Sequence, residues 1–390
     1  MQISLYNPLP YYCLVFLYAL FYIFCTYLKN PFIALWIVFG LLPILDQYVS
    51  MDLLNPTKDQ QRELKNLIRF KIPLLLTIAL DWVFLFWAIN QITDKDQNFL
   101  YKLGVLIVII SLEGASINNS HELNHKIKKF DNIIGTLNLS KSFYMHFIIE
   151  HNQGHHRNVA TFDDPATSRL NESVYRFFPR TVSGTFFSAW EIENRNCAEK
   201  YGNIYTYKNR MIWFSLAIIA LPLIFYAIYG LKGMLLQIVI GIGSFLLLEL
   251  VNYIEHYGLE RKKLENGQYE NVNTTHSWNA PHRFTNYFLF KLQRHSDHHE
   301  NALKPYQNLC TYENSPLLPN GYSLCILMAL FPNLWFEVMN PMVESYKNGA
   351  KPSPKMLESI NKKLMQIVWN LNFGLIGIIL VQFAVNFVLI

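Results

Sequence analysis

The chain has 390 residues and a composition unlike that of a soluble protein. Apolar residues make up 52% of it and aromatic residues 15%, whereas charged residues reach only 16%, against about a quarter in an ordinary globular protein. The formal net charge is +5, and the cations do not gather into the dense patch that a nucleic-acid groove requires. These values exclude a disordered chain and a charge-coated cytosolic enzyme, and they indicate a membrane protein with no nucleic-acid partner.

Seven apolar segments are long enough to cross a membrane, because a hydrocarbon core of roughly 30 Å needs about 20 mostly apolar residues per helix. Apolar and polar residues do not alternate in these segments, so helices are expected rather than strands. We expect an all-α polytopic protein with a six-helix transmembrane bundle and an extra C-terminal span. The segments are Tyr11–Leu28, Phe32–Val49, Ile72–Ile89, Leu103–Asn119, Met211–Tyr229, Met234–Tyr253 and Ile367–Ile390.

Basic residues indicate the orientation of the chain. They cluster at positions 58–69, 126–157 and 261–263, and counting crossings puts all three clusters on one side. Cytoplasmic loops carry an excess of lysine and arginine, so we assign that side to the cytosol. Segments 121–210 and 254–366 are then expected to form one cytosolic cap.

One further apolar run lies within the segments expected to form the cap. It is Gly321–Met339, and it is interrupted by Pro332 and Asn333. We interpret it as an interfacial or re-entrant helix, because proline interrupts a regular helix.

All 12 histidines lie between His121 and His299, and nine of them fall into four short clusters. Nine neutral imidazoles exceed the capacity of one four- to six-coordinate ion and suit two, and imidazole binds zinc, copper, iron and nickel alike. The pattern therefore predicts a dinuclear metal centre at the capped side of the membrane. The expected ligands are His121, His125, His151, His155, His156, His256, His295, His298 and His299.

The spacing within the clusters also predicts which imidazoles share a centre, because residues three or four apart lie on one face of a helix. The remaining histidines, His146, His276 and His282, are interpreted as ordinary core or surface residues. The expected pairs are His121 with His125, His151 with His155, and His295 with His298 or His299.

Two other classes of metal protein fit this pattern less well. The run 121–125 matches the His-Glu-x-x-His motif of zinc proteases, in which Glu122 would be the general base, but such a site needs one more ligand rather than seven. A metal transporter or heme-binding membrane protein should place histidines along a path inside the bilayer. Here they follow the helix ends on one side.

Several acidic residues are candidates for supporting roles. Carboxylates inside the clusters are expected to orient ligand imidazoles, although each can equally be a solvated cap residue; they are Glu122, Glu150, Glu255 and Asp297. An uncompensated acid inside a span costs about 2.5–3.5 kcal/mol. We expect Glu113 and Glu249 to face the metal site or a proton path, and Asp81 to pair within the bundle. Glu249, Glu113, Asp297 and Glu255 are the candidate catalytic residues.

At the four clusters the sequence resembles the integral-membrane alkane monooxygenase family, which includes xylene monooxygenases. The resemblance covers roughly residues 35–345, and its third cluster is not part of the general membrane-desaturase pattern. Stretches 164–169, 276–279 and 321–335 agree as well. The motifs are His-Glu-Leu-Asn-His-Lys at 121–126, Glu-His-Asn-Gln-Gly-His-His at 150–156, Asn-Tyr-Ile-Glu-His-Tyr-Gly-Leu at 252–259 and Leu-Gln-Arg-His-Ser-Asp-His-His at 292–299.

The resemblance implies a membrane di-iron enzyme that uses O2 to hydroxylate the terminal carbon of an alkane or alkyl chain, with the nine clustered histidines as iron ligands. It also implies rubredoxin as the electron donor, itself reduced by an NAD(P)H-dependent reductase. The five scattered cysteines agree, since no Cys-x-x-Cys pair provides a redox cluster within the chain. Residues 1–345 would form the monooxygenase domain. Residues 346–390 would form a linker and a C-terminal span added to the family's pattern.

An apolar tunnel open to the lipid is expected to hold the substrate. Each buried CH2 contributes about 0.8 kcal/mol, so the length of the tunnel would set the preferred chain length. The candidate lining residues are Trp36, Val38, Phe39, Trp82 and Phe86.

A membrane fatty-acyl desaturase or lipid hydroxylase with the same metal chemistry is the alternative. Desaturases usually carry His-x-x-His-His in the second cluster, whereas three residues separate His151 from His155 here. The product distinguishes the two readings, because a hydroxylase forms an alcohol and a desaturase forms a double bond.

Overall fold

The computed structural model describes residues 4–126 and 128–388 and confirms the expected all-α fold. Outside the described residues lie Leu389 and Ile390, which belong to the expected C-terminal span. The first three residues of the expected domain 1–345 also lie outside them. The main helices are α1 (Cys13–Thr26), α2 (Phe32–Trp36), α3 (Leu42–Tyr48), α4 (Lys58–Leu64), α5 (Ile68–Thr93), α6 (Phe99–Asn124), α7 (Lys129–Leu139), α8 (Phe147–Glu150), α9 (His156–Asn158), α10 (Val174–Tyr201), α11 (Arg210–His256), α12 (Arg283–Phe288), α13 (His295–Glu300), α14 (Tyr322–Ala329), α15 (Pro332–Lys347) and α16 (Pro354–Val388).

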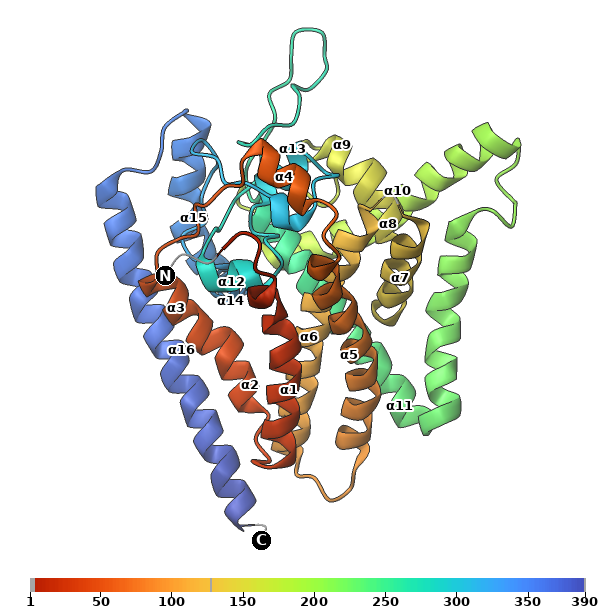
Figure 1. Cartoon of the computed structure of the whole chain (residues 1–390), viewed down its shortest axis with the longest axis vertical. Helices are drawn as coiled ribbons and strands as arrows, with labels where there is room; N and C mark the ends of the chain where they lie inside the picture. Colours follow the sequence, from red (N-terminus) through yellow and green to blue (C-terminus); the bar gives the residue numbers. More distant parts are fainter. Residues whose placement is uncertain (1–3, 127, 389–390) are drawn as a thin grey trace.

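The long apolar helices form a bundle in which the helix axes are roughly aligned (Figure 1). Five helical stretches of the described residues are long and apolar enough to cross a membrane, and the shorter apolar stretch Phe32–Tyr48 accompanies them. The 47-residue α11 contains a break at Gly230, where φ is +68°, a conformation that glycine adopts without steric cost. Its two parts correspond to the fifth and sixth expected spans. The chain is therefore an integral, multi-pass membrane protein.

The elements that carry the histidines lie together at one end of the bundle. Helix α6 packs against α5, α7 and α11, and both α6 and α11 end in histidine-containing turns, at Asn124 and His256. The short helices α8, α9 and α13 lie at this end in Figure 1, together with α4 and α15. The helical bundle thus supports a cap at the ends of α6 and α11, as the sequence predicts.

A buried ion pair joins the bundle to the turn that follows α7. The Lys141 ammonium pairs with the Asp81 carboxylate, and both side chains are almost completely buried. The Tyr18 hydroxyl donates a second hydrogen bond to Asp81, at 2.7 Å. The expectation that Asp81 pairs within the bundle is met by Tyr18 of α1, whereas its cationic partner comes from the turn after α7. A charge that would be costly alone in the bilayer is thereby compensated.

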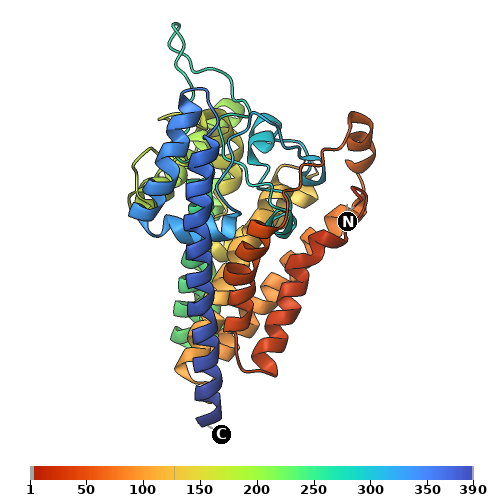
Figure 2. The same cartoon turned by 90° about the vertical axis from the view of Figure 1, so that its left-hand side faces the viewer.

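The C-terminal helix α16 begins at Pro354, well before the apolar segment expected from Ile367, and packs along α2 and α3. Its buried Asn372 donates to the carbonyl of Gly40 at 3.2 Å, and the Trp36 indole donates to the Asn372 side chain at 2.8 Å. Figures 1 and 2 both show its C-terminal end at the far side of the bundle from the cap. The division into residues 1–345 and 346–390 remains a prediction.

The run Gly321–Met339 forms two helices rather than one interrupted helix. Helix α14 ends at Ala329, and α15 begins at Pro332, where proline is tolerated because the first helical N–H has no partner within the helix. Helix α14 contacts α11 and the π-helical turn Ile37–Leu41. It therefore lies where the cap meets the bundle.

Candidate metal centre

The nine clustered histidines come together in two adjacent groups. Five, from α6, the α8–α9 segment and α13, form one group, and four form the other; within each group the potential ligand atoms lie within 4.8 Å of one another. The ring centroids of His156 and His299, which belong to different groups, are 4.5 Å apart. The five-histidine group is His121, His125, His151, His156 and His298, and the four-histidine group is His155, His256, His295 and His299.

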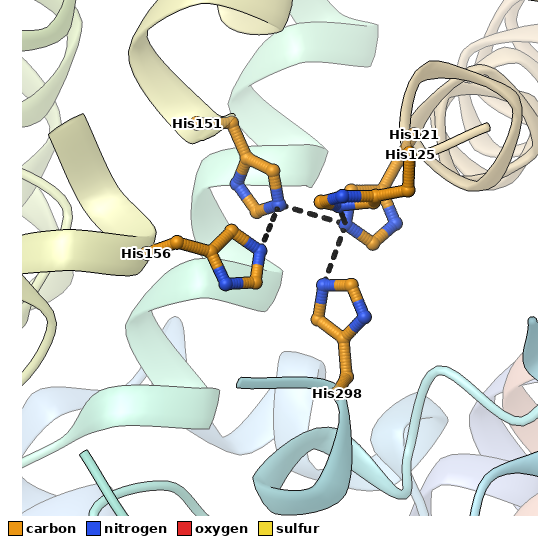
Figure 3. Close-up of side chains that lie close together, drawn as sticks. All are labelled: His121, His125, His151, His156 and His298. Carbon is orange, nitrogen blue, oxygen red and sulfur yellow. Dashed lines mark hydrogen bonds between the residues drawn. The ribbon is translucent and has the colours of Figure 1, made fainter. Parts of the chain in front are cut away.

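Figure 3 shows the rings of the five-histidine group pointing toward one another from three separate segments. The Nε2 atom of His121 lies 2.8 Å from that of His151, 3.0 Å from that of His298 and 3.0 Å from that of His125. One imidazole N–H can donate to one acceptor, so hydrogen bonding among the rings does not account for three such contacts. For metal–nitrogen bonds of about 2.1 Å, ligand atoms at right angles lie about 3 Å apart. The group therefore fits a metal cation.

A π-helical turn decides how the second cluster divides between the groups. Residues His151–His155 form this turn between α8 and α9, and its wider spacing places His156, five residues on, beside His151 at 3.1 Å between Nε2 atoms. The expected pairing of His151 with His155 is therefore wrong, because it assumed α-helical spacing. Such π-bulges occur frequently at functional sites.

Helices α6 and α13 follow the expected spacing more closely. His121 and His125 share a group, and so do His295 and His299, whose Nε2 atoms are 2.9 Å apart. His298 lies in the other group. One short helix therefore supplies ligand candidates to both groups, because adjacent residues point in directions about 100° apart around a helix.

In the four-histidine group, Asp164 orients His155. The Nδ1–H of His155 donates to Oδ2 of Asp164 at 2.8 Å, while its Nε2 is buried without a partner. Although burial raises it, the pKa of Asp164 is held below its ordinary value by His155 and by hydrogen bonds from Thr167 and the amide of Ala166. The arrangement fixes the tautomer that leaves Nε2 free to bind a metal.

His151, His295 and His299 are neutral near pH 7. Burial, and then the neighbouring histidines, hold the pKa of His151, His295 and His299 well below the ordinary value of 6.5. A metal binds the neutral form of imidazole. The site is therefore ready to accept cations without first losing protons.

A mostly apolar cavity lies between α6, α11 and α14. Its α6 wall includes Asn118, three residues before His121, and its α11 wall includes Val251, five residues before His256. The expected Val38 and Phe39 line it, and so does Tyr322. Parts of the cavity wall therefore lie one to two helical turns before His121 and His256.

Comparisons with known proteins agree with this arrangement. A family model described as "Fatty acid desaturase" matches residues 98–332. Alkane 1-monooxygenase 2 from Pseudomonas aeruginosa is 38% identical over 82% of this chain and 86% of its own length. Alkane 1-monooxygenase from Acinetobacter baylyi is 37% identical over 79% of this chain and 76% of its own length. This chain belongs to the alkane monooxygenase family. It is accordingly an oxidoreductase of the monooxygenase type, and a more distant relative is the xylene/toluene monooxygenase hydroxylase component of Pseudomonas putida, at 25% identity over 57% of the chain.

Of the carboxylates expected to orient imidazoles in this alkane monooxygenase family member, Glu255 lies beside a clustered histidine. Its Oε1 is 3.3 Å from Nδ1 of His295. Glu122 instead pairs with Lys126 and accepts from the amide of Tyr306 at 3.2 Å.

The other two carboxylates in the clusters, Asp297 and Glu150, form no hydrogen bond with an imidazole of the described residues either. Asp297 accepts from Lys304 at 2.6 Å and from the amide of Cys310 at 2.6 Å, so it braces the loop that follows α13. Glu150 is buried, and its Oε1 has no hydrogen-bond partner. None of these contacts is to an imidazole.

Glu113 and Glu249 lie inside the bundle, and their hydrogen-bond partners are not clustered histidines. Ser244 donates to Glu113 at 3.3 Å. Glu249 accepts from Tyr144 at 2.7 Å and from Thr181 at 2.6 Å. Their expected catalytic role remains a prediction.

Three of the expected lining residues are not among those that line the cavity. Trp36 bonds to α16, as described above. Trp82 stacks with Phe86, and Phe86 stacks on Phe225 of the first part of α11 at 5.2 Å between ring centroids. These rings pack between helices, and their expected role as lining residues of a substrate tunnel remains a prediction.

The three histidines interpreted as ordinary residues belong to neither group. His146 is buried between Tyr144 and Phe186, and burial lowers its pKa to about 3. His276 lies 3.3 Å from Glu270, and burial lowers the pKa of His282 to about 4.

Sequence reasoning missed Asp164, Tyr322 and Ser277, whose Oγ lies 3.4 Å from Nδ1 of His256. Each falls in a stretch that resembles the family outside the histidine clusters. That agreement was the one signal available, since no spacing rule connects Asp164 with His155.

Proposed function

We propose that this protein hydroxylates the terminal carbon of alkanes or alkyl chains with O2 at a di-iron centre. The observation that carries the proposal is the convergence of nine histidines, eight of them buried, in two adjacent groups at the end of a bundle that encloses a mostly apolar cavity. The names of the curated relatives point to alkanes as the substrate class.

Two iron ions would be held by the five- and four-histidine groups. Alkane C–H bonds offer no acid, leaving group or polarised carbonyl, so the bound metal would supply the activation of O2 that side chains lack. Iron is our proposal for the element, because imidazole alone does not select one metal. Asp164 would keep the imidazole of His155 oriented toward the ions through its hydrogen bond to Nδ1, and Glu255 would act on His295 from 3.3 Å away.

The protein itself would position the substrate and exclude water from it. A substrate that enters from the lipid exchanges one apolar environment for another, so each contact with Val38, Phe39 or Val251 orders the alkyl chain without desolvating a polar group. Asn118, three residues before His121, and Tyr322 are polar residues of the cavity wall, and we propose that they mark its end toward the metal groups. The end of the chain would thus lie nearest the ions.

Electrons would come from a rubredoxin-like protein and its NAD(P)H-dependent reductase. The chain offers no Cys-x-x-Cys pair that could hold a redox cluster. We assign the cap to the cytosol from the lysines and arginines of its loops, and a soluble donor would approach it there.

Lipid desaturation or hydroxylation is the second candidate, and the match to the fatty acid desaturase model over residues 98–332 favours it. Both reactions draw on the same metal chemistry and an apolar substrate site. They differ in the product.

The experiment is product identification with labelled oxygen. Purified protein in lipid nanodiscs is supplied with a rubredoxin, its reductase, NADH and 18O2, together with octane or hexadecane. We expect a 1-alkanol that carries 18O, and none from His298→Ala. An alkene, or activity confined to fatty acyl chains, would contradict alkane hydroxylation and support the second candidate.

A further inference from the structure

Tyr322 connects the apolar cavity with the four-histidine group. Its ring belongs to the cavity wall, and its side chain is completely buried. Its hydroxyl donates to Oε1 of Glu255 at 2.7 Å. The same oxygen lies 3.3 Å from Nδ1 of His295, a close contact without hydrogen-bond geometry. One series of contacts therefore runs from the expected substrate position to a histidine of the metal centre.

The two helices involved make this connection rigid. Glu255 lies on α11 one turn after Val251, which also lines the cavity. Tyr322 is the first residue of α14, which packs against α11. Within the described part of the chain, the Tyr322 hydroxyl is the hydrogen-bond donor to the Glu255 carboxylate. A buried carboxylate held by one hydroxyl rotates more freely when that hydroxyl is removed.

We propose that Tyr322 is a positioning residue that holds Glu255 against His295. The ring limits where the alkyl chain ends, and the hydroxyl fixes the carboxylate that orients a ligand imidazole. The inference rests on the proposed function, because it takes His295 as a metal ligand and the cavity as the substrate site. Partners that orient ligand imidazoles typically change metal affinity by about 10- to 100-fold when they are lost.

Iron release to a chelator under anaerobic conditions tests this role without any turnover. The samples are iron-loaded wild type, Tyr322→Phe, Glu255→Gln and the double variant. We expect each single variant to release one of two iron equivalents about 10-fold faster than wild type. The double variant should release it at the rate of a single variant, because both changes break one connection.

Tyr306→Phe is the matched control. Tyr306 is as deeply buried, and its hydroxyl donates to the carbonyl of Phe70 at 2.7 Å, away from the cavity. If Tyr322→Phe released iron at the control's rate, the inference would be overturned while the proposed function would stand. The same holds if the acceleration in the double variant were the product of the two single effects. Wild-type protein that binds no iron would overturn the proposed function as well. Thermal unfolding of the metal-free samples separates loss of the fold from loss of the connection.

Discussion

At the scale of single residues, the metal centre depends on which nitrogen each imidazole presents. His155 has a hydrogen-bonded Nδ1 and a free Nε2 because Asp164 accepts from the former. The sequence predicts that His155 is a ligand, but not that Asp164 orients it. The turn that brings Asp164 back to the histidine has no periodic signature, so the contact is visible only in three dimensions.

We expect Asp164→Asn to weaken metal binding by about 10- to 100-fold, because the amide can stabilise the wrong tautomer of His155. Metal titration of the metal-free protein measures this. Asp163→Asn changes the exposed neighbour and serves as the control. Equal affinity in Asp164→Asn and wild type would contradict the orienting role.

His146 should make stability sensitive to acid. Its pKa is about 3 in the folded protein and near 6.5 in the unfolded chain, so its contribution is complete above pH 6.5 and is lost as the pH falls toward 3. Between pH 7 and pH 5 this amounts to about 2 kcal/mol. In His146→Phe the decrease in unfolding free energy over that interval should shrink by this amount, as measured by denaturation in detergent. An unchanged pH dependence would refute the assignment.

At the scale of helical elements, regular spacing predicts some of the site and misses the rest. His121 and His125 share a group because α6 keeps α-helical geometry to its end. His151 and His156 share a group because a single π-helical turn widens the spacing. The spacing rules do not predict that turn. The aromatic residues of α5 show the same limit, since the packing of Phe86 depends on where the first part of α11 lies.

Val38, in the π-helical turn after α2, should control the chain length of the substrate. Val38→Phe fills part of the cavity, so alkyl chains that reach this position no longer fit, whereas shorter chains still do. The preferred alkane should become shorter in competition assays over C6 to C16. Val83→Phe adds the same bulk to an exposed position of α5 and should leave the profile unchanged. Identical profiles for Val38→Phe and wild type would exclude Val38 from the substrate path.

At the scale of the whole molecule, the transmembrane bundle holds the cap through buried polar contacts as well as apolar packing. Composition and segment length predict the bundle and its extra C-terminal helix, because lipid demands long apolar helices. They do not predict that Lys141, which follows α7, reaches Asp81 in α5. That partner comes from the turn between α7 and α8, which the pattern of spans leaves undefined.

Removing one member of this pair should cost more than removing both. Lys141→Met leaves a buried carboxylate unpaired and should destabilise the protein by about 3–5 kcal/mol, whereas Asp81→Leu with Lys141→Met should recover most of the loss. Unfolding in mixed micelles measures this. Arg62→Gln breaks an exposed pair with Asp59 and should change stability little. A Lys141→Met protein as stable as wild type would show that the pair does not hold the cap.

The number of iron ions per chain tests the central claim most directly. Mass-spectrometric metal analysis of the purified protein, with protein concentration from amino-acid analysis, should give two iron ions in wild type and in His146→Phe. His298→Ala and His299→Ala, which each change one group, should retain about one. A chain that binds no iron, or one whose iron content is unaffected by both alanine substitutions, would contradict a di-iron centre held by these histidines.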